Sequence, residues 1–133
     1  MRATVEVRVL VTNLVVCIVD DDEAVRCATA SVVRALGWPT RVFASAEEFL
    51  QAADVVGQLA CLICDVHMTG MSGVEMHERL LERGYAPPTI FVTAFPTPAL
   101  EAKIRANGAF AFLEKPVDAT AIAHCLARVC GKA

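Results

Sequence analysis

The stretch of sequence that decides the fold is LVVCIVDDD, at residues 14–22. Its first six residues are apolar without interruption, and three consecutive aspartates follow them. An apolar run of this length indicates a β-strand that is covered on both faces, because a strand with one face in water would alternate. A second run of the same kind occupies residues 59–64 and is followed by Asp65. We therefore predict two central strands of a parallel sheet, each ending in carboxylates.

Outside these two runs, short β-branched stretches alternate with longer helical patterns, which is typical of repeated strand–helix units. We predict strands near residues 14–19, 40–43, 59–64, 89–93 and 109–113. We predict helices near residues 22–36, 45–54, 72–83, 97–107 and 118–130, with Ser45 and Ser72 as N-caps. Five such units with right-handed crossovers predict an α/β fold. It is a three-layer αβα sandwich around a five-stranded parallel sheet of the flavodoxin-like (βα)5 type.

Residues 1–13 stand outside this scheme. Valine occupies every second position from Val5 to Val11, a pattern that an extra half-buried strand would produce. A disordered extension, or a product of the chosen start site, would explain the segment equally well. We therefore divide the chain into an N-terminal extension, residues 1–13, and one domain, residues 14–133, which is long enough for a single core.

The composition argues against several classes of protein. A net charge of −3 and a pI near 5.6 provide no basic surface, so we expect no direct nucleic acid binding by this segment. The first apolar run is too short to cross a membrane and lacks a signal-peptide cleavage site. We therefore expect a cytoplasmic protein whose six cysteines are reduced. Cys61 and Cys64 have C-x-x-C spacing, but on a strand they point to opposite faces and are poorly placed to share a metal.

The residues that can carry chemistry lie at the predicted carboxyl ends of strands, where open α/β sheets bind ligands. They are Asp20, Asp21, Asp65, Thr93 and Lys115. Carboxylates that leave two adjacent strands repel one another unless a cation neutralises them, and Mg²⁺ prefers such oxygen ligands. Asp65 is the candidate nucleophile, because a carboxylate can accept a phosphoryl group as an acyl phosphate. Lys115 and the Thr93 hydroxyl would then hold the phosphoryl oxygens.

Four strings, taken in order, resemble the motifs of response-regulator receiver domains of two-component systems. They are IVDDDE (18–23), DVHMTGMSG (65–73), VTA (92–94) and EKP (114–116). The resemblance extends from Leu14 nearly to the C-terminus. The stretch VFASAEEFL, at residues 42–50, looks like the receiver subgroup that often precedes a LuxR-type DNA-binding domain.

This resemblance implies signal transduction by Mg²⁺-dependent phosphoryl transfer from a histidine kinase or phosphotransfer protein to Asp65. It implies that the main-chain carbonyl of His67 joins Asp20, Asp21 and Asp65 as a metal ligand. Thr93 and Phe112 occupy the positions of the family's switch pair, and the bond from Lys115 to Pro116 is a candidate cis peptide. Such a chain is a phosphoacceptor and not an enzyme, with at most slow self-dephosphorylation, and its output domain is absent from this chain.

From the same resemblance we expect the phosphorylated form to dimerise or to bind a partner through the face that combines helix 97–107, strand 109–113 and helix 118–130. Two positions depart from the family pattern. Thr69 and Gly70 replace a proline and an acidic residue, so we expect a looser loop after Asp65. His67 and Phe95 occupy the variable positions that flank the site and tune hydrolysis of the acyl phosphate.

Three alternatives stay open. A phosphatase of the haloacid-dehalogenase type also uses an aspartyl nucleophile, Mg²⁺, a hydroxyl and a lysine, but the acidic pair expected after the lysine is missing and there is no room for a substrate cap. A receiver-like interaction module that has lost phosphorylation is less favoured, because all five polar positions are present. The chain could also be the N-terminal piece of a DNA-binding regulator, which would change the output and not the chemistry.

Overall fold

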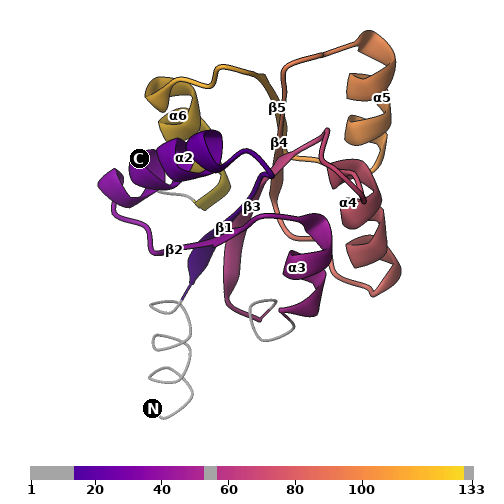
Figure 1. Ribbon diagram of the computed structural model, residues 1–133, viewed down its shortest axis with the longest axis horizontal. Coiled ribbons are helices and arrows are strands. Elements are labelled where there is room, and N and C mark those ends of the chain that lie inside the picture. The colour runs from indigo at the N-terminus through magenta and orange to yellow at the C-terminus, as the bar shows by residue number, and fades with distance from the viewer. Residues whose placement is uncertain (1–13, 53–56, 131–133) are drawn as a thin grey trace.

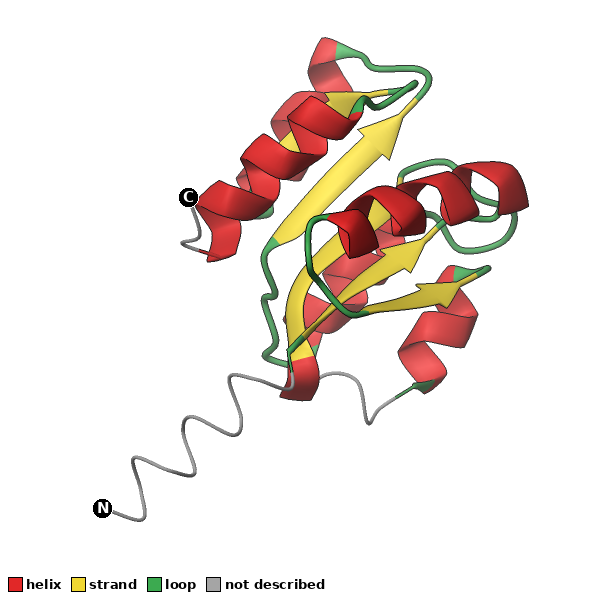
Figure 2. Ribbon diagram, turned by 90° about the vertical axis from the view of Figure 1, so that its left-hand side faces the viewer, coloured by secondary structure: helices red, strands yellow, loops and turns green. Residues whose placement is uncertain are grey.

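The computed structural model describes residues 14–52 and 57–130, which form a parallel sheet between two layers of helices (Figures 1 and 2). The strands are β1 (Val15–Val19), β2 (Thr40–Phe43), β3 (Leu59–Asp65), β4 (Thr89–Thr93) and β5 (Ala111–Glu114). The helices are α2 (Glu23–Ala35), α3 (Ala46–Gln51), α4 (Gly73–Glu82), α5 (Pro98–Ala106) and α6 (Ala119–Cys130). The predicted α/β class and the five-stranded parallel sheet are confirmed. The extra strand considered for residues 1–13 lies outside the described residues.

The strands are arranged in the order β2-β1-β3-β4-β5, and all neighbours are parallel. Nearly every residue of β1, β3 and β4 is buried, whereas the edge strands β2 and β5 are mostly half-buried or exposed. The continuous apolar runs of the sequence therefore belong to central strands. The order reverses between β1 and β3, and this reversal is where open α/β sheets bind ligands.

Side chains alternate along the strands between two separate cores, one on each face of the sheet. One core packs β1, β3 and β4 against α3, α4 and α5, and includes Phe49, Met76 and Phe91. The other packs the same strands against α2 and α6, and includes Val33 and Ile122. Figure 1 shows α2 and α6 together on one side of the sheet and the other three helices opposite.

The two cysteines of the C-x-x-C spacing belong to different cores. Cys61 packs on the side of α2 and α6, and Cys64 on the side of the other three helices. The two side chains therefore point to opposite faces of the sheet, as predicted for residues three apart on a strand.

The loops that lead from the carboxyl ends of the strands into the helices end in N-caps. Asp22, Ser45, Ser72 and Thr97 each accept a main-chain N–H three residues on, and Ser72 forms a complete capping box with Glu75. Four helices thus begin close to the edge of the sheet that carries the predicted site. None of the described helices combines the length and hydrophobicity that a membrane span requires.

Candidate functional site

Two buried carboxylates lie at the carboxyl ends of the adjacent strands β1 and β3. Asp20 directly follows β1 and is 3% exposed, and Asp65 ends β3 and is 5% exposed. Asp21 is exposed beside them, and one oxygen from each of the three aspartates lies within 4.8 Å of the others. The parallel ladder between β1 and β3 therefore places the predicted carboxylates in one pocket.

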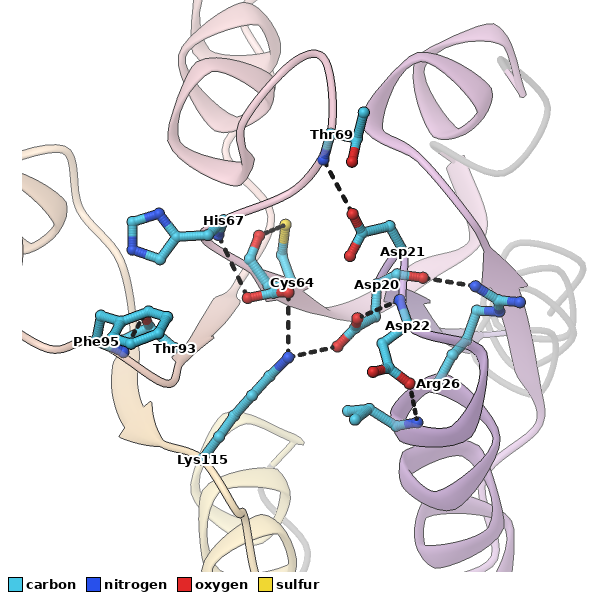
Figure 3. Close-up of polar contacts among 12 residues, drawn as sticks. Asp20, Asp21, Asp22, Arg26, Cys64, His67, Thr69, Thr93, Phe95 and Lys115 are labelled. Atoms are coloured by element: carbon cyan, nitrogen blue, oxygen red, sulfur yellow. Dashed lines mark hydrogen bonds and ion pairs between the residues drawn. The ribbon is translucent and has the colours of Figure 1, made fainter.

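Lys115 supplies the positive charge of this pocket. Its Nζ donates to Asp20 Oδ2 at 3.0 Å and to Asp65 Oδ2 at 3.1 Å (Figure 3). Its main-chain N–H donates to the carbonyl oxygen of Thr93 at 2.8 Å, and its bond to Pro116 is cis. Burial disfavours the ammonium, but the two carboxylates outweigh burial and raise the pKa of Lys115.

The pocket keeps an excess of negative charge. Burial raises the pKa of Asp65, and the nearby Asp20 acts in the same direction, while the hydrogen bond from Lys115 opposes both. Counted by formal charge, three carboxylates and one ammonium leave two negative charges uncompensated. Hard oxygen donors grouped in this way fit a divalent cation such as Mg²⁺, so the residues present are compatible with the predicted metal.

The turn after β1 is held by main-chain contacts. Asp20 Oδ1 accepts the N–H of Asp22 at 2.9 Å, and Arg26 Nη1 donates to the main-chain oxygen of Asp20 at 2.7 Å. Arg26 was not predicted from the sequence, because its target is a backbone atom and any arginine in the first turns of a helix would look the same. It stabilises the path of the chain that aims Asp20 into the pocket.

Acidic side chains hold the loop between β3 and α4. Thr69 donates its main-chain N–H to Asp21 Oδ2 at 2.9 Å, and Met71 donates to Glu47 Oε2 at 3.0 Å. Gly70, between them, has a φ of +80°, a conformation that L side chains rarely adopt. The sequence predicted a looser loop from the missing proline; in the structure, hydrogen bonds to carboxylates hold its backbone.

The start of α4 packs directly on the backbone of the candidate nucleophile. Gly73 lies so close to the carbonyl oxygen of Asp65 that a Cβ would overlap it, and the same Cβ would be 2.8 Å from Cys64 Sγ. The Cys64 thiol donates to this carbonyl at 3.2 Å. Burial, followed by the charges of Asp65 and Asp20, raises the pKa of Cys64, so the thiol stays protonated.

The remaining predicted residues lie on the other side of the pocket. Thr93 is fully buried at the end of β4, and its Oγ1 accepts the main-chain N–H of Phe95 at 3.0 Å. Phe95 is 71% exposed, and its ring meets His67 edge to face, with ring centroids 6.0 Å apart (Figure 3). The main-chain N–H of His67 donates to Asp65 Oδ1 at 3.3 Å.

Phe112 is half-buried in β5 and packs against the core on the side of α3, α4 and α5.

A mostly apolar cavity of about 410 Å³ opens beside the pocket. It lies between α2 and α6, and its lining includes Ala28, Val32, Val92, Ile122 and Lys115. Lys115 therefore contributes to two features at once, the acidic pocket through its ammonium and the apolar cavity through its lining position.

The fold and the pocket together define the class of this protein. It is a flavodoxin-like α/β domain with an acidic pocket at the carboxyl ends of its parallel strands. Comparison with known proteins narrows the class to a family, since residues 16–127 match the response regulator receiver domain. The chain belongs to the response-regulator receiver domains of two-component systems. This membership favours the receiver over the phosphatase alternative.

The chain is 42% identical over 104 residues to the response regulator protein TmoT of Ectopseudomonas mendocina, a match that covers 77% of this chain and 46% of TmoT. It is 36% identical over 101 residues to the transcriptional regulatory protein TdiR of Thauera aromatica, covering 76% of this chain and 44% of TdiR. The crystal structure of FixJ-N has a TM-score of 0.80 at 32% identity and covers 90% of this chain and 95% of FixJ-N. The chain spans about half the length of the curated relatives named here.

Proposed function

We propose that this receiver domain is a phosphoacceptor in which Asp65 takes a phosphoryl group from a phosphohistidine of a histidine kinase or phosphotransfer protein. The observation that supports this most directly is the position of Lys115. Its ammonium bridges Asp20 and Asp65 at hydrogen-bonding distance, within a cluster that can accept a divalent cation. Phosphoryl transfer depends on this combination of positioning and positive charge.

In the proposed reaction, a carboxylate oxygen of Asp65 forms a bond to phosphorus while the bond from phosphorus to the donor nitrogen breaks. The donor imidazole leaves with the electron pair of that bond. Lys115 then has an additional anionic partner, and the Thr93 hydroxyl can donate its hydrogen to a phosphoryl oxygen, because in the described structure Oγ1 acts as an acceptor. We propose that hydrolysis of the product is slow, so that the domain signals and does not act as an enzyme.

We propose Mg²⁺ as the metal, held by carboxylate oxygens of Asp20, Asp21 and Asp65 and by the main-chain carbonyl of His67. When bound, it would supply positive charge that stabilises the phosphoryl oxygens. The protein's own contribution is to keep Asp20 and Asp65 buried and close to Lys115.

The decisive experiment is incubation with acetyl phosphate and MgCl₂, followed by intact mass measurement. Wild type should gain the mass of one phosphoryl group, whereas Asp65→Asn should gain none, because the variant keeps the side-chain shape and lacks the nucleophilic oxygen. Asp22→Asn is a matched control, since it removes a neighbouring exposed carboxylate and asparagine also serves as an N-cap. Phosphorylation of Asp65→Asn to the wild-type level would contradict the assignment.

We further propose that the phosphodonor protein docks over the apolar cavity between α2 and α6, because this cavity opens beside Lys115. Ala28→Arg should then slow phosphoryl transfer from a phosphohistidine protein and leave phosphorylation by acetyl phosphate unchanged. Ala99→Arg, which places the same charge on exposed α5, is the control. Equal transfer rates for both variants would exclude this docking surface.

For the output, we propose that phosphorylation draws Thr93 and Lys115 towards Asp65 and that Phe112 moves into the space left by Thr93. The face formed by α5, β5 and α6 would then support a homodimer in the cytoplasm. Sedimentation with and without beryllofluoride, on wild type and on Thr93→Ala, tests this. Dimerisation of activated wild type alone is expected, and a wild type that stays monomeric would contradict the proposal.

A further inference from the structure

The loop between β3 and α4 makes a contact outside the aspartate cluster. Glu47, an exposed residue in the first turn of α3, accepts the main-chain N–H of Met71 on Oε2 at 3.0 Å. The same oxygen lies 2.8 Å from the place where a Cβ on Gly70 would be. The loop therefore follows the Glu47 carboxylate closely, although the contact joins residues 24 positions apart in the chain.

This loop carries or contacts two of the proposed metal ligands. His67, its second residue, has a main-chain carbonyl that is a proposed ligand, and Thr69 donates its N–H to Asp21 Oδ2 at 2.9 Å. The loop is held again at its far end, where Gly73 donates its N–H to the carbonyl oxygen of Val66 at 2.9 Å. A contact that fixes Met71 therefore restricts where His67 and Thr69 can lie, and through Thr69 it restricts Asp21.

We propose that Glu47 is a positioning residue that sets the Mg²⁺ affinity of the site by holding the β3–α4 loop at Met71. Glu47 is outside the cluster of three aspartates whose oxygens lie within 4.8 Å of one another, so it acts through the loop backbone. The inference rests on the proposed function for the identity of the metal.

The test is calorimetric titration of the full chain with MgCl₂. Glu47→Ala should weaken Mg²⁺ binding roughly fivefold, the effect expected when one ordinary hydrogen bond is lost. Glu47→Gln should keep an affinity close to that of wild type, because its amide oxygen can still accept the N–H of Met71. Glu48→Ala is the matched control, since it removes the same charge from the same exposed turn, whereas the N–H of Met71 donates to Glu47.

A second measurement needs no metal. In EDTA, amide hydrogen exchange at Met71 should be roughly fivefold faster in Glu47→Ala than in wild type and unchanged in Glu48→Ala and Glu47→Gln. Because Glu47 is exposed, all three variants should fold, and the exchange pattern of the central strands verifies this in the same spectra.

The outcomes distinguish this inference from the proposed function. If wild type itself binds no Mg²⁺, the metal of the proposed function is wrong, while faster Met71 exchange in Glu47→Ala would still support the loop contact. If wild type binds Mg²⁺ and Glu47→Ala binds it as tightly as Glu48→Ala does, the positioning role of Glu47 is wrong. Equal losses in Glu47→Ala and Glu47→Gln would assign the effect to charge and overturn the role of the hydrogen bond.

Discussion

The loops that follow β3 and β4 border the same pocket and are held in different ways. Between β3 and α4, the main-chain N–H groups of Thr69, Met71 and Ser72 are bound by Asp21, Glu47 and Glu75, and Gly73 packs on the backbone of Asp65. Between β4 and α5, residues 94–97 are all exposed, and the described bond within this turn is from Phe95 to Thr93 Oγ1.

This difference separates two requirements of the proposed function. A metal site needs ligands that are already in place, because positioning them after binding would reduce the affinity. A switch needs an element that can move at low cost, and such elements have few packed contacts. We infer that the β3–α4 side is the fixed part of the pocket and the β4–α5 side is the part that can respond.

The largest loss of stability should come from overpacking the junction between the β3–α4 loop and α4. In Gly73→Ala, the new methyl group would overlap the main-chain oxygen of Asp65, and neither this backbone nor buried Cys64 can yield easily. We expect a loss of about 3 kcal/mol in the free energy of unfolding, measured by urea denaturation. Gly57→Ala is the control, because nothing lies within 4 Å of a Cβ there. Similar stabilities for the two variants would show that the β3–α4 junction is not tightly packed.

The second largest loss of stability should come from Lys115, which contacts Asp65 at the end of β3 and Thr93 at the end of β4. Lys115→Gln should lower the free energy of unfolding at pH 7 by about 2 kcal/mol, because the buried carboxylates of Asp20 and Asp65 lose their cation. This loss of stability should shrink as the pH falls towards 4, because protonation of Asp65 removes its repulsion with the carboxylate of Asp20. Lys103→Gln, at an exposed ion pair with Glu78, should change stability by less than about 0.5 kcal/mol. A Lys115→Gln loss that does not depend on pH would contradict this explanation.

The central strands and the charged residues at their carboxyl ends were predictable from the sequence. Uninterrupted apolar runs identify central parallel strands, and the carboxyl ends of such strands meet at one edge of the sheet. Asp20, Asp65 and Lys115 were therefore expected to converge before any distance was known. The boundary of β3 was predicted one residue short, because Asp65 ends the apolar pattern while its backbone still pairs with Val92.

The contacts of the loops were not predictable in the same way. Glu47 and Glu48 are adjacent acidic residues in the first turn of a helix, where both favour the helix dipole. Only the folded path of a loop 24 residues away shows that Glu47 accepts a hydrogen bond from it. Arg26 and Cys64 likewise bind main-chain oxygens, which carry no side-chain pattern that a sequence could display.

Substitution of the candidate nucleophile Asp65 should have a smaller effect on the free energy of unfolding, and this effect should be stabilising. Burial raises the pKa of Asp65 above its ordinary value of 3.8. The protonated carboxyl is therefore favoured in the folded protein, and the free energy of unfolding decreases as the pH rises from 3.8 through the folded-state pKa of Asp65. Asp65→Asn removes this loss and should stabilise the metal-free protein by about 1 kcal/mol at pH 7. Urea denaturation in EDTA between pH 4 and pH 7 should show an advantage that grows with pH. An advantage that shrinks as the pH rises would mean that burial does not dominate at Asp65.

The smallest effect on stability should come from the β4–α5 side of the pocket. Phe95 is 71% exposed, so Phe95→Ala should change the free energy of unfolding by less than about 0.5 kcal/mol. The ring nevertheless pairs edge to face with His67 next to Asp65, and we infer that this pair would slow the approach of water to a phosphoryl group on Asp65. We expect hydrolysis of the acyl phosphate to become roughly two- to tenfold faster, which corresponds to the energy of one aromatic pair.

The decay of the phosphorylated species can be followed by intact mass after acetyl phosphate is removed. His67→Ala should accelerate hydrolysis to a similar extent, and the double variant should decay little faster than either single variant, because each substitution breaks the same pair. Phe95→Leu is the control that keeps apolar bulk without the ring, and it should fall between wild type and Phe95→Ala. If Phe95→Ala costs as much stability as Gly73→Ala, or if its acyl phosphate decays at the wild-type rate, the contrast between the two loops is wrong.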